Sequence, residues 1–448
     1  MARNVVILVV VTFIAVVVQC QKTDNKVVCY YNSKGYFREG QGRFDLPFIE
    51  PALQYCTHLI YGYAGVNAEN FKLVPLNEQF DVTRDHYRHI TNLKRQYPGL
   101  RVLLSVGGDA DDVDTIKYLT LLESVDHRLS FVNSAFTIVK SFGFDGLDIA
   151  WEFPKTKPKK IRSGWGSFWH DVKTTFVGDS VPDEKEAEHK EQFTALVREV
   201  KNAFRPEGFI VTITVNPNVN SSVYYDTRAL IPNVDFVNLL AFDFYTPGRN
   251  PKEADYPSPL YSLIDRKPDE NADAWVRHWL ENGAPNNKLI LGIPTYGRAW
   301  KMTEDSAISG VPPFKVKGAA EEGPYTKEPG LLSYPEVCAK ISNPLNLKGA
   351  GSHLRKVGDP TKRYDEVRFN VSDVSNRYGV YAFRLPDENG ENGVWVGYED
   401  PDTAGNKAAY ARAKGLGGVA IYDITLDDFR GLCNGEKFPV LKAAKFRL

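Results

Sequence analysis

The chain has 448 residues, with 55 Lys and Arg against 56 Asp and Glu, and carries a formal net charge of −1. This balance gives no support to a nucleic-acid partner, because such proteins concentrate basic charge against the phosphate backbone. The length allows one large core, and it suits a single barrel of about 250 residues with insertions.

The first twenty residues (1–20) are predicted to be a secretory signal peptide. Arg3 precedes an apolar run from Val5 to Val18, after which the chain turns polar. The run is shorter than the roughly 20 residues that a spanning helix needs. We expect cleavage after Cys20; the alternative is a retained signal anchor. No later stretch is apolar enough to cross a bilayer, so the mature chain is predicted to be secreted, extracellular and without a membrane span.

Four cysteines remain in the mature chain, Cys29, Cys56, Cys338 and Cys433. An even number in a secreted chain predicts two disulfide bonds. Four cysteines permit three pairings, and we expect the near-neighbour one, Cys29 with Cys56 and Cys338 with Cys433.

Two Asn-X-Ser sequons fit the same compartment. They begin at Asn220 and Asn370, and both are predicted glycosylation sites. A sequon alone is a weak signal, so this prediction depends on secretion.

Eight strand-like runs, most of them followed by a helical pattern, predict parallel βα units. They span 26–31, 57–66, 101–108, 143–153, 209–216, 236–245, 288–296 and 417–424. Apolar residues at helical spacing occupy 85–96, 124–141, 185–204 and 271–282. This alternation favours an α/β fold of the (β/α)8 TIM barrel type over an open doubly wound sheet. No glycine-rich dinucleotide fingerprint follows the first run, which also counts against the open sheet.

The run from Gly143 to Pro154 reads GFDGLDIAWEFP. As a strand, it places Phe144, Gly146, Asp148, Ala150 and Glu152 on one face and Asp145, Leu147, Ile149, Trp151 and Phe153 on the other. We expect the second, mostly apolar face to pack outward on helices while the carboxylates of the first point inward. Carboxylates at the C-terminal end of a strand are typical of a barrel with its active site at the mouth.

Two intervals exceed an ordinary βα connection. The interval 155–185 begins with basic residues and continues with aromatic ones. It is either a long loop packed on the barrel or a basic, aromatic surface that contacts a glycan or a receptor. The interval 301–389 is predicted to be a small inserted α+β domain that forms one wall of a cleft. The remaining organisation is then barrel strands one to seven in 21–300 and completion of the barrel in 390–448.

Four motifs follow one another at barrel spacing. The first is the DGxDxDWExP pattern, matched at Asp145, Gly146, Asp148, Trp151, Glu152 and Pro154 but not at Ala150; the others are Ser105-Val-Gly-Gly, Tyr296-Gly-Arg298 and Val394-Trp-Val-Gly-Tyr398. Together they resemble the signature, the third strand, the seventh strand and the stretch after the inserted domain of glycoside hydrolase family 18, the chitinases. The resemblance spans nearly the whole mature chain and implies the same barrel with its insertion.

The resemblance also implies a chemistry and shows where this chain departs from it. In family 18 a Glu protonates the leaving oxygen, and the substrate's own N-acetyl group is the nucleophile. Glu152 stands at the position of that acid, and Asp148 at that of the inner supporting carboxylate. The cationic intermediate is held by an Asp two residues before the acid and by a Tyr of the sixth strand. Here these positions are Ala150 and Phe242.

A third departure lies on the last strand, where Tyr422 stands at the usual position of a Trp beneath the sugar. Losing one preorganised electrostatic partner costs on the order of 10²–10³ in rate, and losing two that grip the same group need not be additive. A combined loss of roughly 10³–10⁵ would still leave negligible turnover. We therefore predict no catalytic residues, with Asp148, Glu152 and Asp243 as vestigial ones. Glu152, Tyr296, Arg298 and Tyr422 are predicted to contact a sugar.

No cofactor and no metal are expected. His86 and His89 share one turn of a predicted helix, but no further ligand motif accompanies them, so we interpret them as a solvated helix face.

Within the family, Ala150, Phe242 and the long basic insertion most resemble the insect imaginal disc growth factors, a chitinase-like branch that often replaces the acid as well. This chain retains Glu152. The resemblance implies a secreted protein without chitinase activity that acts as a growth factor or remodelling signal, with an unknown cell-surface receptor or glycan, such as a chitin oligosaccharide, as partner. The alternatives are a weakly active chitinase or transglycosylase that uses Glu152, and a structural or haemolymph-type protein with a vestigial cleft.

Overall fold

The computed structural model describes residues 25–111, 114, 116–153, 183–217, 219–262, 266–303, 306, 312–339, 355–357, 379–384, 386 and 392–448. The predicted signal peptide, nearly all of 155–185 and the sequon at Asn370 lie outside these residues. None of the helices in the described parts combines the length and apolar character that a membrane span requires.

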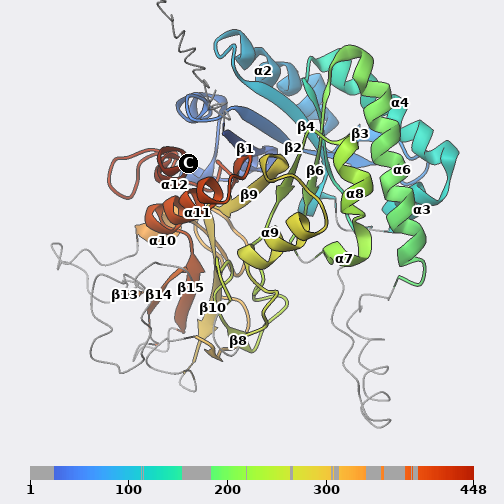
Figure 1. The fold of residues 1–448 in the computed structure, drawn as a ribbon. Coiled ribbons are helices and arrows are strands. Elements are labelled where there is room, and N and C mark those ends of the chain that lie inside the picture. The colour runs from blue at the N-terminus through green and yellow to red at the C-terminus, as the bar shows by residue number, and fades with distance from the viewer. Residues whose placement is uncertain are drawn as a thin grey trace, which may run out of the picture.

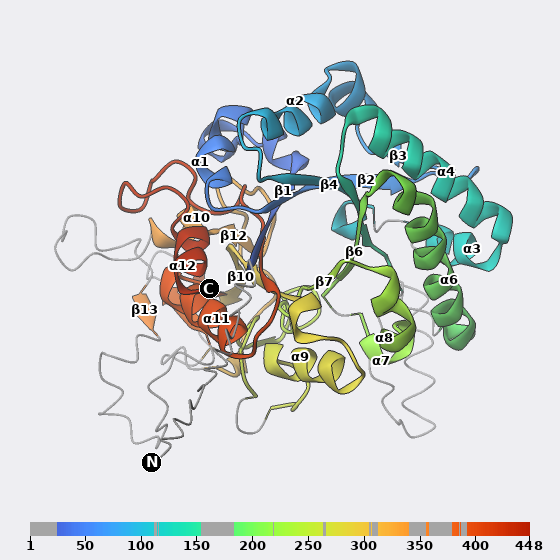
Figure 2. The ribbon, with the colours of Figure 1, turned by 45° about the horizontal axis from the view of Figure 1, so that its top comes forward.

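Eight parallel strands form a closed barrel, which Figure 2 shows nearly end on. They are β1 (Lys26–Asn32), β2 (His58–Val66), β4 (Arg101–Gly107), β5 (Gly146–Ala150), β6 (Ile210–Val215), β7 (Phe236–Leu239), β9 (Leu289–Pro294) and β16 (Gly418–Tyr422). The ring closes because β1 pairs in parallel with β2 on one side and with β16 on the other. The predicted TIM barrel is confirmed, and each predicted strand overlaps one of these eight.

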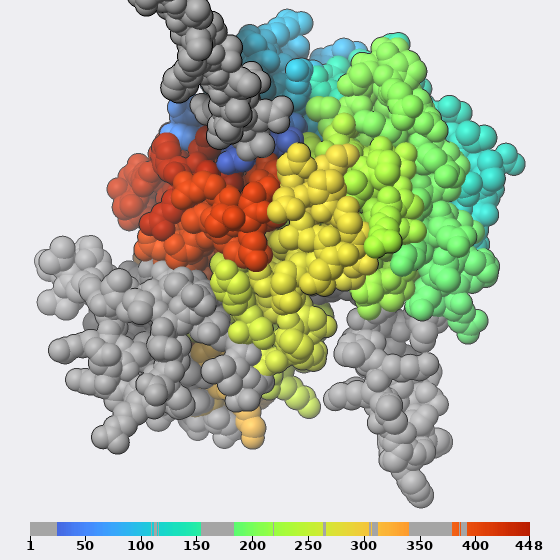
Figure 3. Space-filling model, viewed as in Figure 1, coloured from blue at the N-terminus to red at the C-terminus, as the bar shows by residue number. Residues whose placement is uncertain are grey.

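Helices surround the barrel (Figure 1). They are α1 (Glu50–Leu53), α2 (His86–Asn92), α3 (Ile116–Glu123), α4 (Val125–Phe142), α6 (Glu186–Phe204), α7 (Ser221–Tyr224), α8 (Thr227–Leu230), α9 (Ala272–Glu281), α11 (Pro401–Ala413) and α12 (Pro439–Arg447). In the space-filling view, the red residues of the C-terminal helices and the yellow residues around α9 lie side by side on the face toward the viewer (Figure 3).

The signature strand β5 is shorter than predicted and begins at Gly146. A side chain at Gly146 would lie about 2.0 Å from the carbonyl oxygen of Ile210 on β6, so the close approach of these strands requires glycine. Leu147, Ile149 and Trp151 pack in the outer core against the helices, as the alternation predicts. Phe144 was expected to face inward, but it precedes the strand and packs in that outer core instead.

A second, antiparallel sheet follows β9. It consists of β10 (Tyr296–Met302), β12 (Leu331–Ser333), β13 (Arg355–Val357), β14 (Val380–Arg384) and β15 (Gly393–Tyr398), and α10 (Tyr334–Cys338) follows β12. Its strands reach past both bounds of the interval 301–389. The division of the chain into an inserted domain at those bounds stays a prediction.

Two disulfide bonds join Cys29 to Cys56 and Cys338 to Cys433, the pairs that the sequence analysis favours. The first connects β1 to the segment just before β2. The second connects the end of α10 to the segment between β16 and α12.

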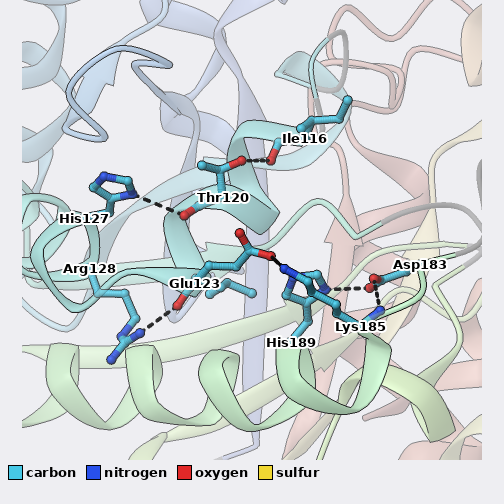
Figure 4. Close-up of polar contacts among 9 residues, drawn as sticks. Ile116, Thr120, Glu123, His127, Arg128, Asp183, Lys185 and His189 are labelled. Carbon is cyan, nitrogen blue, oxygen red and sulfur yellow. Dashed lines mark hydrogen bonds and ion pairs between the residues drawn. The ribbon is translucent and has the colours of Figure 1, made fainter.

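A polar cluster fixes the beginning of α6 to the end of α3 (Figure 4). The buried ring of His189 lies between two carboxylates, with Nδ1 2.7 Å from Asp183 and Nε2 3.4 Å from Glu123. The exposed Lys185 donates to the same Glu123 carboxylate at 2.8 Å. These contacts fix residues 183–189 against the end of α3.

Candidate functional site

Asp148 lies on the inner face of β5 and is fully buried. It is the centre of a hydrogen-bond network across four strands: its carboxylate accepts from Ser105 at 2.8 Å, Thr212 at 2.6 Å, Thr214 at 2.8 Å and Asn238 at 3.3 Å. Burial raises the pKa of Asp148, and these four hydrogen bonds act in the opposite direction. The network makes Asp148 a rigid interior support.

Glu152 lies just past the end of β5 and is 3% exposed. Its Oε1 accepts a hydrogen bond of 2.8 Å from Nδ2 of Asn216, the first residue after β6. Tyr225 is nearby as well: burial raises the pKa of its phenol, and the negative charge of Glu152 raises it further. Glu152 thus reaches the mouth of the barrel, as predicted, and an amide contacts it there.

Ala150 is the last residue of β5 and is 1% exposed. It lies two residues from Asp148 and two from Glu152 on the same inner face. Its methyl group offers no charge or hydrogen bond where the family pattern has a carboxylate.

Asp243 follows β7 in the left-handed region, with φ of 56°. Its carboxylate accepts from Nε of Arg298 at 2.9 Å, from Nη2 of Arg298 at 2.6 Å and from the Tyr296 hydroxyl at 2.7 Å. Burial disfavours the charge of Arg298, but the Asp243 carboxylate outweighs this and the pKa of Arg298 lies well above its usual value. The structure therefore brings three of the predicted site residues into one ion-paired cluster.

Tyr422 ends β16 and lies among aromatic rings. Its hydroxyl is 2.7 Å from that of Tyr63 at the opposite side of β1, and its ring centroid is 5.1 Å from Tyr30 and 5.6 Å from Phe242. Phe242 also meets the ring of Tyr296 edge to face at 6.2 Å. All five rings are at least nine-tenths buried, so the mouth has an aromatic floor.

Asn216, Tyr225 and Tyr63 are not among the residues that the sequence pattern predicts for the site. A usable signal existed for Asn216, because polar residues directly after barrel strands belong to the mouth. Tyr63 and Tyr225 gave no such signal, because both occur in aromatic-rich stretches that are equally typical of a hydrophobic core.

The interpretation of His86 as part of a solvated face is wrong. His86 is 3% exposed, packs against the tilted ring of Phe80 with ring centroids 4.0 Å apart, and lies 2.9 Å from the Tyr31 hydroxyl through Nε2. Burial lowers the pKa of His86 to about 3. The helix turns this residue toward β1 and β2, while His89 is exposed.

In the described part of the chain, one group of three metal-type ligands lies close together: Cys338, Asp428 and Cys433. Its two cysteines are joined in a disulfide bond, so they offer no thiolate to a metal.

Comparison with known proteins places the barrel and its mouth in one family. The pattern of glycosyl hydrolases family 18 matches residues 26–427. The chain is 54% identical to "Chitinase-like protein Idgf4" of Glossina morsitans morsitans, over 95% of this chain and 94% of that protein. It is 51% identical to "Imaginal disk growth factor 6" of Drosophila melanogaster, over 96% and 94%.

Solved structures agree. The catalytic domain 2 of Ostrinia furnacalis Group II chitinase is 29% identical, with a TM-score of 0.76 over 95% of this chain and 96% of that one. Human YKL-39, described as a pseudo-chitinase with retained chitooligosaccharide binding properties, is 26% identical, with a TM-score of 0.71 over 94% and 99%. The chain therefore belongs to glycosyl hydrolases family 18, in the chitinase-like branch that contains the insect imaginal disc growth factors.

Proposed function

We propose that this chain is a secreted, catalytically disabled member of family 18 that acts as a growth factor or remodelling signal. The observation that carries the proposal is the buried methyl group of Ala150 between Asp148 and Glu152. At the same mouth, the ring of Phe242 reaches toward Tyr422 and Tyr296 without a hydroxyl.

Ala150 and Phe242 lack the carboxylate and the hydroxyl that would stabilise a developing cation. Each missing partner in a water-excluded site costs on the order of 3 kcal/mol of transition-state stabilisation. The Asp243 carboxylate does not replace them, because its oxygens are engaged with Arg298 and Tyr296. Glu152 alone supplies neither the nucleophile's orientation nor its charge stabilisation.

Sugar binding is the second part of the proposal. Tyr296, Arg298, Tyr422 and Glu152 gather rings, a cation and a carboxylate at one end of the barrel, and stacking with directed hydrogen bonds is how proteins hold sugars. The described binding of chitooligosaccharides by human YKL-39 supports the same ligand class here. A cell-surface receptor would be a separate partner of the signalling protein.

Secretion is the third part. Two disulfide bonds suit an oxidising compartment. Asn220 is exposed, and it caps α7 through Oδ1, which accepts from Ser222 N at 3.1 Å. A glycan would attach to Nδ2 and leave that cap intact.

Hydrolysis of a fluorogenic chitooligosaccharide tests the disabled site. We expect turnover at least 10³-fold below an active family 18 chitinase assayed in parallel. Turnover within a hundredfold, abolished by Glu152→Gln, would instead establish the alternative, a weak chitinase or transglycosylase that uses Glu152.

Calorimetric titration with chitotetraose tests the sugar-binding part. We expect saturable binding that Arg298→Ala weakens at least tenfold. This change removes a side chain that is predicted to contact the sugar, and it leaves the Asp243 carboxylate without its ion pair. If the wild-type protein gave no heat of binding, the sugar-binding part of the proposal would be wrong, and the protein would be a signalling protein with a vestigial site.

A further inference from the structure

Asn216, which follows the adjacent strand β6, lies beside Glu152. β5 and β6 are parallel, with Asp148 beside Thr212 and Ile149 beside Ile213. The same register, continued by three residues, places Asn216 beside Glu152. Asn216 is 8% exposed, so the contact between them lies in the interior.

The orientation of the Asn216 amide is determined by three acceptors. Nδ2 donates to Oε1 of Glu152 at 2.8 Å, to the carbonyl oxygen of Ala150 at 3.2 Å and to that of Trp151 at 3.4 Å. Turning the amide over would place Oδ1 against three oxygens. The two carbonyls are backbone groups that cannot donate a hydrogen bond. The NH2 group of Asn216 therefore faces Glu152 whether Glu152 is protonated or not.

An amide and a carboxylate differ in what they do for an acid. A carboxylate at position 150 would share or pass a proton with Glu152, whereas the NH2 group of Asn216 only donates a hydrogen bond to Glu152 and an amide does not titrate. Asn216 therefore orients Glu152 without serving its acid–base chemistry, and it occupies Oε1.

The phenol of Tyr225 also interacts electrostatically with Glu152. Tyr225 is 3% exposed, and its hydroxyl has no hydrogen-bond partner among the residues that the structure describes. Glu152 thus has an amide donor on one side and a buried phenol within electrostatic range.

We propose that Asn216 is a positioning residue that holds Glu152 as a fixed hydrogen-bond acceptor for a ligand, and that it is a third barrier to hydrolysis beside Ala150 and Phe242. This inference rests on the proposed function, because it explains what the retained Glu152 does in a disabled site. It follows that restoring a carboxylate at position 150 and a hydroxyl at position 242 still leaves Glu152 hydrogen-bonded to the amide of Asn216.

Repair of the site in two steps tests the proposal. The double variant Ala150→Asp/Phe242→Tyr should hydrolyse a fluorogenic chitooligosaccharide faster than the wild type. Adding Asn216→Ala should raise kcat at least a further tenfold while KM changes less than threefold, because it removes the hydrogen bond to Glu152 and leaves the predicted sugar contacts Tyr296, Arg298 and Tyr422 in place. A triple variant no faster than the double one, whether both are active or inactive, overturns the role of Asn216.

Ser105→Ala in the double variant is the matched control. It also removes one buried hydrogen bond to a β5 carboxylate, that of Asp148 at 2.8 Å, but leaves Glu152 untouched. We expect no gain in kcat, and a gain equal to that of Asn216→Ala would mean that any loosening of the interior suffices.

A second measurement needs no sugar. Thermal unfolding of Asn216→Ala, Glu152→Ala and the double change should give a double loss smaller than the sum of the single losses, because both remove one contact. Additive losses would overturn the contact itself. The proposed function fails on a different result, wild-type turnover within a hundredfold of an active chitinase, so the two failures are distinguishable.

Discussion

Asp427 is fully buried in the segment between β16 and α12, and its carboxylate contacts the first turn of α12. It accepts from the backbone N–H groups of Leu441 at 3.0 Å, Val440 at 3.4 Å and Asp428 at 2.8 Å. Burial nevertheless raises the pKa of Asp427 to about 7, and the adjacent Asp428 carboxylate adds to this rise. The native state therefore holds this proton to a higher pH than the unfolded chain does.

The sign of the pH effect follows. Between the ordinary carboxyl pKa and the raised pKa of Asp427, about 7, the native state binds more protons, so stability falls as pH rises through this range. Relative to Asp427→Asn, the wild type should lose up to about 1.4 kcal/mol of unfolding free energy per pH unit. Urea unfolding at pH 5, 6 and 7 measures this difference; a constant or rising difference would contradict it.

The carboxylate of Asp148 accepts hydrogen bonds from four side chains in the barrel interior. We expect these hydrogen bonds to contribute more to stability than the packing of the Asp148 side chain does. Asp148→Leu leaves Thr212, Thr214 and Asn238 with buried polar groups to satisfy, so we expect a loss on the order of 3 kcal/mol or more. Asp148→Asn keeps one acceptor oxygen and should lose less than half as much. Guanidinium unfolding compares the two variants, and equal losses would assign the effect to packing.

At the level of elements, His189 joins the first turn of α6 to the end of α3. His189→Leu removes both contacts of a side chain that is 3% exposed and leaves Asp183 without its 2.7 Å partner. We expect a loss of about 1–3 kcal/mol and faster hydrogen exchange in the first turn of α6. Lys185→Ala is the control, because this exposed ion pair contributes about 1 kcal/mol or less. Equal effects of the two changes would contradict the assignment.

For the molecule as a whole, the two disulfide bonds close loops of different length. Cys29 and Cys56 are 27 residues apart, and Cys338 and Cys433 are 95 apart. Loop-closure entropy predicts losses of about 3.5 and 4.7 kcal/mol when each pair is replaced by alanine. Unfolding in guanidinium measures both pairs, and a larger loss for the shorter loop would show that native contacts dominate.

Much of the fold could be predicted because barrel strands and helices carry local periods of two and 3.6 residues. The same periodicity placed Asp148 and Glu152 on one face of the predicted strand 143–153. It misplaced Phe144, because a pattern does not mark where a strand begins. It also misjudged His86, because the apolar faces of a short helix can be assigned only once its neighbours are known.

The sequence by itself determined the family, the barrel and the departures from the family pattern at Ala150 and Phe242, since each is a matter of local pattern or residue identity. Only the tertiary structure decided what surrounds Glu152. Asn216 and Glu152 are 64 residues apart and meet through strand register, and Tyr63 and Tyr422 are 359 apart and meet across β1. Hydrogen bonds between side chains depend on distance and direction in space, and the order of residues along the chain specifies neither.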